Sequence, residues 1–258
     1  MKKEERPQMK QPQIRVDLIN NTPNAVNTLI YTKSTRLEQG ADTRVKVTNM
    51  TECEKDEQLK YMANTIPSSW EFINYVFEIK NVTRAFTHQF VRTRTGSYAQ
   101  QTMRMLNKKS FTYRIPPRFE AKGMEVARKK YIDCMSEIQA CYDALIDGGA
   151  EVEDARGVLP TNIHTNIIAQ FNLRTISEMA KTRTGLRTQD EYREVLEQMI
   201  GAVLKVHPWA EHFLMPEKHK NIKVLESFVT KQLGDGGVPE DEKYDILKAL
   251  DKIRKGDS

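Results

Sequence analysis

Residues 88–104 read HQFVRTRTGSYAQQTMR, and this stretch decides how the rest of the chain is interpreted. It places three arginines, Arg92, Arg94 and Arg104, around the hydroxyl residues Ser97 and Thr102 and around Gly96. Guanidinium groups bind phosphate oxygens in a bidentate manner, hydroxyl and backbone N–H groups donate further hydrogen bonds, and a glycine lets the backbone approach a ligand closely. The composition therefore indicates an anion-binding loop, with an exposed basic loop as the alternative.

The sequence before this loop predicts a strand followed by a short helix. Residues 71–79 are rich in aromatic and β-branched side chains, which favours a strand. Within 82–91 the apolar residues recur at 82, 85, 86 and 90, which is helical spacing. Residues 92–104 follow no period, so we expect a loop or an irregular strand there, the kind of segment in which functional groups gather.

Elsewhere the hydrophobic period predicts mainly helices. Thr22 before Pro23 indicates the start of a helix over 22–31, and an apolar stripe over 124–145 ends at Gly148 and Gly149. Further helices are expected over 54–64, 163–181, 191–206, 221–233 and 240–255, with a turn at 234–237. The result is one compact α+β domain over 14–215, with a flexible tail at 1–13 and a helical extension at 216–258.

The composition is that of a soluble globular protein: 258 residues, 39% hydrophobic and 29% charged, with a net charge of +5. No run of 18 apolar residues is present and no apolar leader follows Met1, so we expect neither a membrane span nor a secretory signal. Cys53, Cys134 and Cys141 cannot form a disulfide framework or a CxxC metal pattern, which favours a cytoplasmic location. The five histidines predict no metal site.

The central stretch resembles the signature of the flavin-dependent thymidylate synthases, which runs Arg-His-Arg, seven residues and then Ser. The matching positions are Phe77-Glu78-Ile79, Arg84-Ala85, His88-Gln89, Val91-Arg92, Arg94, Ser97-Tyr98, Gln100-Gln101, Arg104 and Phe111 to Pro117. Other blocks occur in the family's order: Thr22-Pro23-Asn24, Ala155 to Pro160, Asn172-Leu173-Arg174, Arg183 and Gln189 to Arg193. The resemblance covers residues 17–215 and implies a single domain with a central antiparallel-type sheet flanked by helices.

The resemblance assigns substrate-binding roles to positions in this chain. Thr102, the backbone of Met103, and Arg104 correspond to the group that holds the nucleotide phosphate. Gln89 and Gln100 correspond to other nucleotide contacts, and Arg156 to an arginine that crosses a subunit interface. Arg183 corresponds to the arginine that reads the pyrimidine, and it is also the catalytic candidate.

The resemblance also implies cofactors. The flavin-binding positions of the family correspond to Ser68, Glu71, Arg92, Thr93, Arg94, Asn172 and Arg174. The implied reaction is the reductive methylation of dUMP to dTMP: NADPH reduces FAD, methylenetetrahydrofolate supplies the one-carbon unit, and a flavin hydride completes the methyl group at C5. The cofactors perform the difficult steps, and the protein binds, orients and polarises. A homotetramer with composite active sites is implied as well.

Some positions depart from the family pattern. Thr93 replaces the central histidine of Arg-His-Arg, Met105 stands in place of an aromatic residue, and Ile66 and Phe72 replace two histidines. These changes alter contacts with flavin and folate. Thr102 replaces the serine of the signature but keeps a hydroxyl, so the phosphate-binding group is largely intact. Three interpretations stay open: a divergent thymidylate synthase, an enzyme that hydroxymethylates C5 of a pyrimidine nucleotide, and a relative that binds nucleotide without turnover. Whether dUMP, dCMP or UMP is the substrate stays open too.

A nucleic-acid-binding protein is the rival of a different class. A net charge of +5 is modest for such a protein. Apart from Tyr98, the loop 92–104 offers no aromatic side chain on which bases could stack, which disfavours this interpretation. We therefore expect a small phosphorylated molecule as the partner, and neither nucleic acid nor a membrane.

Overall fold

The computed structural model describes residues 12–35, 42–183, 188–215, 224–225 and 244–250. Contacts between residues divide the chain into two compact units. Unit 1 comprises residues 1–15, 79–92 and 99–167, and unit 2 comprises residues 16–78, 93–98 and 168–258.

A four-stranded antiparallel sheet in the order β1-β2-β4-β3 forms the framework. Its strands are β1 Arg15–Asn21, β2 Asn74–Thr83, β3 Ser97–Gln100 and β4 His164–Asn172. In β4, every second side chain is buried, from Thr165 through Ile167 and Ala169 to Phe171. This period of two belongs to a strand with one face in the core. The α+β class with an antiparallel sheet, expected from the sequence, is confirmed.

Two strands pass into helices without a connecting loop. Strand β2 leads directly into α4 (Arg84–Phe90), and β4 leads directly into α7 (Leu173–Arg183). The Thr83 hydroxyl accepts the N–H of Phe86 at 3.0 Å, and the Asn172 side-chain oxygen accepts the N–H of Thr175 at 2.8 Å. These side chains satisfy N–H groups that have no partner within the first helical turn.

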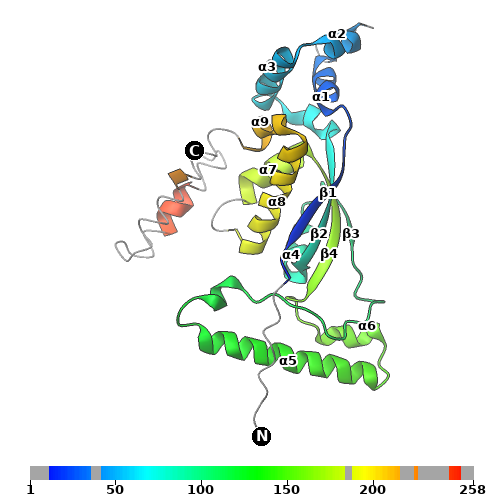
Figure 1. The fold of residues 1–258 in the computed structure, drawn as a ribbon, viewed down its shortest axis with the longest axis vertical. Helices are drawn as coiled ribbons and strands as arrows, with labels where there is room; N and C mark the ends of the chain where they lie inside the picture. Colours follow the sequence, from blue (N-terminus) through cyan, green and yellow to red (C-terminus); the bar gives the residue numbers. More distant parts are fainter. Residues whose placement is uncertain (1–11, 36–41, 184–187, 216–223, 226–243, 251–258) are drawn as a thin grey trace. The chain divides into compact units, whose positions relative to one another are not determined.

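Unit 2 contains most of the helices. They are α1 Ala25–Ser34, α2 Thr43–Asn49, α3 Glu52–Ala63, α7, α8 Asp190–Val206 and α9 Glu211–Leu214, with the 3-10 helices η1 Pro67–Phe72 and η4 Pro208–Ala210. Helices α7 and α8 lie side by side (Figure 1). The buried apolar residues of α8 recur at helical spacing, which makes one face of this helix part of the core. Trp70 packs edge-to-face on Phe213, with ring centroids 4.9 Å apart.

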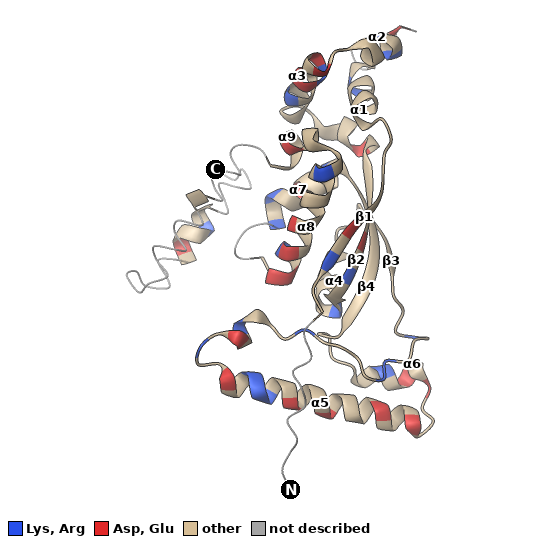
Figure 2. Cartoon of the chain, viewed as in Figure 1, with Lys and Arg blue, Asp and Glu red and all other residues tan. Residues whose placement is uncertain are grey.

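Unit 1 contains α4, the long helix α5 (Glu125–Asp147), α6 (Val152–Ala155), and the 3-10 helices η2 (Pro117–Glu120) and η3 (Arg156–Val158). The basic side chains of α5 lie together near its N-terminal end, and acidic side chains follow along the rest of the helix (Figure 2). Of its residues only Met135 and Tyr142 are buried. Met135 joins Phe111 and Ile163 in a small core cluster.

Three predicted elements differ from the structure. The first helix begins at Ala25 rather than near Thr22, because Asn24 has a φ of 50° and the Thr22 hydroxyl accepts the N–H of Asn74 at 2.8 Å. Thr22 therefore belongs to the turn after β1, a strand that was not predicted. The strand predicted over 71–79 begins at Asn74, since 71–72 end η1. The helix predicted over 163–181 is wrong in its first half, which is β4.

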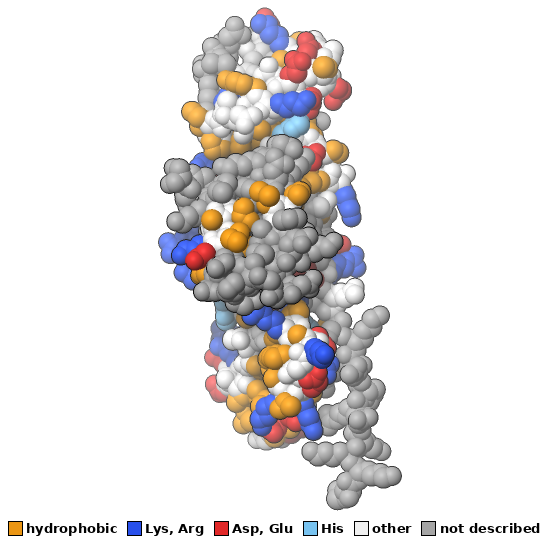
Figure 3. All heavy atoms as spheres, turned by 90° about the vertical axis from the view of Figure 1, so that its left-hand side faces the viewer, with side chains coloured by type: hydrophobic (Ala, Val, Ile, Leu, Met, Phe, Trp, Pro, Cys, Tyr) orange, Lys and Arg blue, Asp and Glu red, His pale blue; other side chains and the backbone are white. Residues whose placement is uncertain are grey.

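The helices predicted over 54–64, 82–91, 124–145 and 191–206 are confirmed as α3, α4, α5 and α8. Most of the predicted tail at 1–13, the turn at 234–237 and most of the extension 216–258 lie outside the described residues. The proposed boundaries of the domain 14–215 stay a prediction. Within the described ranges, no helix is both long and apolar enough to cross a membrane. The face shown in Figure 3 carries basic and acidic side chains interspersed with hydrophobic ones.

Candidate functional site

Two of the predicted substrate-binding arginines converge on one acidic residue of unit 1. Arg104 Nε forms an ion pair with Glu153 Oε2 at 2.5 Å, and Arg156 Nε donates to the backbone oxygen of Glu153 at 3.0 Å. Glu153 lies in α6 and was not predicted as a site residue. The Arg104 side chain is 69% exposed, so its guanidinium is accessible to a ligand.

The other predicted substrate residues of unit 1 take several positions. The Thr102 hydroxyl accepts the N–H of Arg104 at 3.0 Å and so shapes its own loop. Met103 packs its side chain against the core cluster of Phe111. Gln100 turns its amide toward α4, where Nε2 donates to Thr87 Oγ1 at 2.7 Å. Gln89, at the C-terminal end of α4, is exposed.

Two cations that were not predicted as site residues bind Gln101, the residue before Thr102. Arg84 Nη2 donates to the Gln101 backbone oxygen at 2.8 Å, and Lys108 Nζ donates to its side-chain oxygen at 3.2 Å. Burial, and secondly the charge of Arg156, lowers the pKa of Arg84. Burial, and secondly the charge of Arg84, lowers the pKa of Lys108. In the sequence, Arg84 is only one of the positions that match the family motif, and nothing in the sequence distinguishes Lys108 as a site residue.

In unit 2, Arg174 is held between two carboxylates. Its Nη1 contacts Glu71 Oε1 at 2.7 Å and its Nε contacts Glu178 Oε1 at 2.9 Å. These hydrogen bonds, with that of Glu178 the stronger, raise the pKa of Arg174. Two predicted flavin-binding positions, Glu71 and Arg174, are thus brought together. Glu178 was not predicted, although it lies four residues after Arg174, the spacing at which helical side chains meet.

The other predicted flavin positions of unit 2 lie on the same elements or on the turn at 93–96. Ser68 shares η1 with Glu71, and Asn172 caps α7 two residues before Arg174. The Thr93 backbone oxygen accepts the Tyr98 hydroxyl at 2.7 Å, which fixes the turn, while Arg94 is exposed. Arg92 belongs to unit 1, where it is exposed in the turn that follows α4.

Arg183, the catalytic candidate, is the last residue of α7. Its guanidinium carbon lies 5.6 Å from the centre of the Tyr192 ring, a cation–π distance. Burial raises the pKa of Tyr192, and a hydrogen bond with the Thr93 side chain partly opposes this effect. The side chains of Thr93, Tyr192 and Arg183 therefore form a connected series in unit 2.

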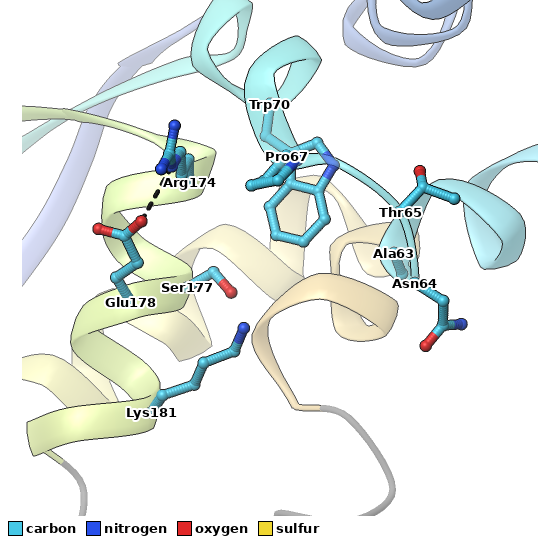
Figure 4. A pocket seen from close by; sticks show the side chains of 9 residues that line it. All are labelled: Ala63, Asn64, Thr65, Pro67, Trp70, Arg174, Ser177, Glu178 and Lys181. Carbon is cyan, nitrogen blue, oxygen red and sulfur yellow. Dashed lines mark hydrogen bonds and ion pairs between the residues drawn. The ribbon is translucent and has the colours of Figure 1, made fainter. Parts of the chain in front are cut away.

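A pocket of about 290 Å³ lies between η1 and α7 in unit 2 (Figure 4). Its lining residues are Ala63, Asn64, Thr65, Pro67, Trp70, Arg174, Ser177, Glu178 and Lys181. The Trp70 indole N–H is buried and has no hydrogen-bond partner among the described residues. In the part of the chain that the structure describes, no group of three or more His, Cys, Asp or Glu side chains is placed to hold a metal ion.

A model of the family described as thymidylate synthase complementing protein matches residues 17–209. A curated flavin-dependent thymidylate synthase of Sulfurisphaera tokodaii is 32% identical over 160 residues, which cover 61% of this chain and 59% of that protein. The flavin-dependent thymidylate synthase of Clostridium tetani is 32% identical over 154 residues, covering 54% of this chain and 61% of the relative. The chain thus spans about three fifths of the length of these curated relatives.

A solved structure shares the fold. It is that of a UMP/dUMP methylase, PolB, from Streptomyces cacaoi bound with 5-Br dUMP. The TM-score is 0.65 at 18% sequence identity, and the alignment covers 79% of this chain and 95% of the other. At this identity the likeness concerns the fold alone.

Proposed function

Since the chain belongs to the thymidylate synthase complementing protein family, we propose that it methylates C5 of dUMP to give dTMP, with a flavin and a folate one-carbon donor. One observation carries this proposal: the family match at 17–209 includes both the exposed Arg104 of the anion-binding loop in unit 1 and the Glu71–Arg174 contact of unit 2. The curated relatives named above are flavin-dependent thymidylate synthases, which supports the same reaction class.

On the nucleotide side, the loop of Thr102, Met103 and Arg104 binds the phosphate. A phosphate oxygen accepts hydrogen bonds from guanidinium, hydroxyl and backbone N–H groups, and this loop offers all three kinds. Met103 anchors the loop through its side chain, so its backbone is free to face the ligand. Gln89 and Gln100 supply further polar contacts with the nucleotide, as does Arg156 of a neighbouring subunit.

On the cofactor side, the chemistry of the donor set fits FAD. Arg174 uses Nε and Nη1 for Glu178 and Glu71, which leaves the N–H groups of Nη2 for an oxygen of the cofactor diphosphate. Arg92 and Arg94 are exposed guanidinium groups, and the Asn172 amide nitrogen is a further donor. With Ser68, Glu71 and Thr93 these residues would hold the flavin, and a bound flavin supplies the hydride for the methyl group.

The protein's own part in the chemistry is binding and polarisation. Arg183 reads a pyrimidine carbonyl oxygen and stabilises negative charge that develops there, because a guanidinium stays protonated at neutral pH. Contact with the Tyr192 ring limits the positions that the Arg183 side chain can take. NADPH and methylenetetrahydrofolate act as co-substrates.

The assembly proposed with this function is a homotetramer with composite sites. In it, Arg156 reaches the nucleotide of a neighbouring subunit. Light scattering coupled to size-exclusion chromatography measures the assembly mass directly, and a monomer at micromolar concentration that is fully active would contradict the composite site.

The alternative reaction is C5 hydroxymethylation, in which water rather than hydride completes the one-carbon unit. Ile66 and Phe72 are the reason to retain hydroxymethylation as an alternative. Both are apolar, 68% and 58% exposed, and stand where the family has histidines. Neither side chain can donate or accept a proton. A silent nucleotide-binding relative is the third outcome.

One experiment separates these outcomes. The protein is incubated with dUMP, FAD, NADPH and methylenetetrahydrofolate, and the nucleotide is analysed by mass spectrometry, with UMP and dCMP in parallel. A gain of CH2 on dUMP is the expected result, and a gain of CH2O establishes hydroxymethylation. Unchanged nucleotide, together with no flavin retained by the protein after free FAD is removed by gel filtration, would remove the proposed reaction.

A further inference from the structure

Arg84 and Lys108, the two cations that bind Gln101, differ from neighbouring cations because they have no carboxylate as an ion-pair partner among the described residues. Arg104 pairs with Glu153, and Lys109 pairs with Asp147. Within the described residues, no carboxylate forms an ion pair with Arg84 or Lys108, whose side-chain contacts go to the neutral oxygens of Gln101. Two positive charges without a carboxylate partner therefore meet at this residue.

The same two cations are partly withdrawn from water. Arg84 Nε is buried and has no hydrogen-bond partner in the part of the chain that the structure describes. Burial lowers the pKa of both side chains, and each has a further cation near it. Burying a charged group without a counter-charge costs free energy, so such a cluster favours the binding of an anion.

Gln101 holds this cluster in place. Its backbone N–H donates to the Asn166 oxygen of β4 at 3.0 Å, which ties it to the sheet. Its backbone and side-chain oxygens then orient Arg84 and Lys108. The backbone N–H of Lys108 donates to the buried Tyr142 hydroxyl at 3.0 Å, so the loop around Lys108 is anchored independently of its side chain.

We propose that Arg84 and Lys108 bind the phosphate of the nucleotide and contribute more to its affinity than the exposed Arg104. A phosphate monoester carries about −1.5 to −2 charges at pH 7, which two cations balance. With Nε buried and one N–H of Nη2 bound to Gln101, Arg84 offers the other N–H of Nη2 and those of Nη1 to phosphate oxygens, and Lys108 offers a compact point charge. Both act where the local dielectric constant is lower than in water, which strengthens their attraction to the anion. This inference rests on the proposed function and names two binding residues for it.

Adjacent lysines provide a matched test. Lys108→Met removes one of the two cations on Gln101, and Lys109→Met removes an exposed lysine whose partner is Asp147. Titration calorimetry with dUMP should show that Lys108→Met weakens binding about 10- to 100-fold, the loss expected for a charge-assisted hydrogen bond. Lys109→Met should bind like the wild type, and Lys108→Arg should recover much of the affinity. Deoxyuridine, which has no phosphate, should not distinguish the proteins.

Equal dUMP affinity of Lys108→Met and wild type would overturn the inference while leaving the methylation proposal intact. If the wild type does not bind dUMP, the proposed function fails instead, and inorganic phosphate then tests the cluster by itself. Phosphate should raise the Tm of wild type and Lys109→Met relative to the same ionic strength of chloride, but not that of Lys108→Met. Equal shifts in all three proteins, or none, would refute the phosphate site.

Discussion

The substitution Gly96→Ala tests how tightly the loop of the signature is packed. An ideal Cβ on Gly96 would lie 2.4 Å from Phe171 Cε1, 2.8 Å from its Cδ1 and 2.8 Å from the Tyr98 hydroxyl oxygen. Phe171 is 1% exposed and packs edge-to-face on Tyr98, with ring centroids 5.7 Å apart. The Tyr98 hydroxyl in turn donates to the Thr93 oxygen. A methyl group therefore has to displace a buried ring, a hydrogen bond or the loop itself.

Overpacking of this kind costs about 1–3 kcal/mol of unfolding free energy. For a chain of this size, each kcal/mol lowers the Tm by about 2–4 °C. Urea unfolding followed by circular dichroism measures the difference, and Gly201→Ala in α8 is the matched control. A Cβ at Gly201 meets nothing within 4 Å, so alanine there should stabilise the helix by about 0.5–1 kcal/mol.

The two variants should thus move in opposite directions. If Gly96→Ala unfolds at the wild-type midpoint while Gly201→Ala unfolds later, the loop at 93–98 does not rest on Phe171 as described. The same result would remove the reason for a glycine at this position of the signature.

Further changes have defined outcomes. Burial, and secondly the charge of Arg114, lowers the pKa of His164 to about 4. In the unfolded chain this histidine has its ordinary pKa of about 6.5, so as the pH falls the unfolded state is protonated before the folded state. The free energy of unfolding should decrease as the pH falls from about 6.5 to 4. In urea titrations this decrease should be about 1–2 kcal/mol smaller for His164→Gln than for the wild type, a figure discounted for partial exposure; identical pH profiles of the two proteins would contradict this role of His164. Arg174→Gln should weaken FAD binding about 10-fold by fluorescence quenching while changing stability by less than about 1 kcal/mol, because its ion pairs are exposed; unchanged FAD affinity would exclude Arg174 from the flavin site. Arg104→Ala should weaken dUMP binding in calorimetry with little change in Tm, since the side chain is 69% exposed; wild-type affinity would remove Arg104 from the site. Thr51→Ala removes the hydroxyl of the capping box with Glu54 at the start of α3 and should cost about 1 kcal/mol in thermal unfolding; an unchanged Tm would show that α3 does not need this cap.

The fold could be predicted where one face of an element is strongly apolar. Helix α8 buries Val195, Met199 and Val203 at helical spacing, and its prediction was confirmed. Strand β4 was mistaken for a helix because two of its buried positions are Thr165 and Ala169, which are weakly hydrophobic, whereas Ile168 on the other face is 39% exposed. The period of two is therefore hidden in the sequence.

The site divides in the same way. The arginines could be proposed from the sequence, Arg104 from the chemistry of its motif and Arg156 and Arg174 from the family resemblance, and their roles stay predictions. Their carboxylate partners could not, since Glu153 lies 49 residues from Arg104 and Glu71 lies 103 residues from Arg174. Only Glu178, four residues from Arg174, is placed by local geometry. Lys108 is one lysine among many in the sequence, and only burial beside Gln101 distinguishes it.

The loop-free passage from strand to helix has a consequence for ligand capture. Arg84 is the first residue of α4 and Arg174 the second residue of α7, so each guanidinium stands within one turn of a strand end. The backbone that carries each arginine is therefore already ordered, so less conformational entropy is lost when an anion binds, which lowers the entropic cost of association. We therefore expect an anion to associate with these two arginines at a rate set by diffusion and charge rather than by loop closure.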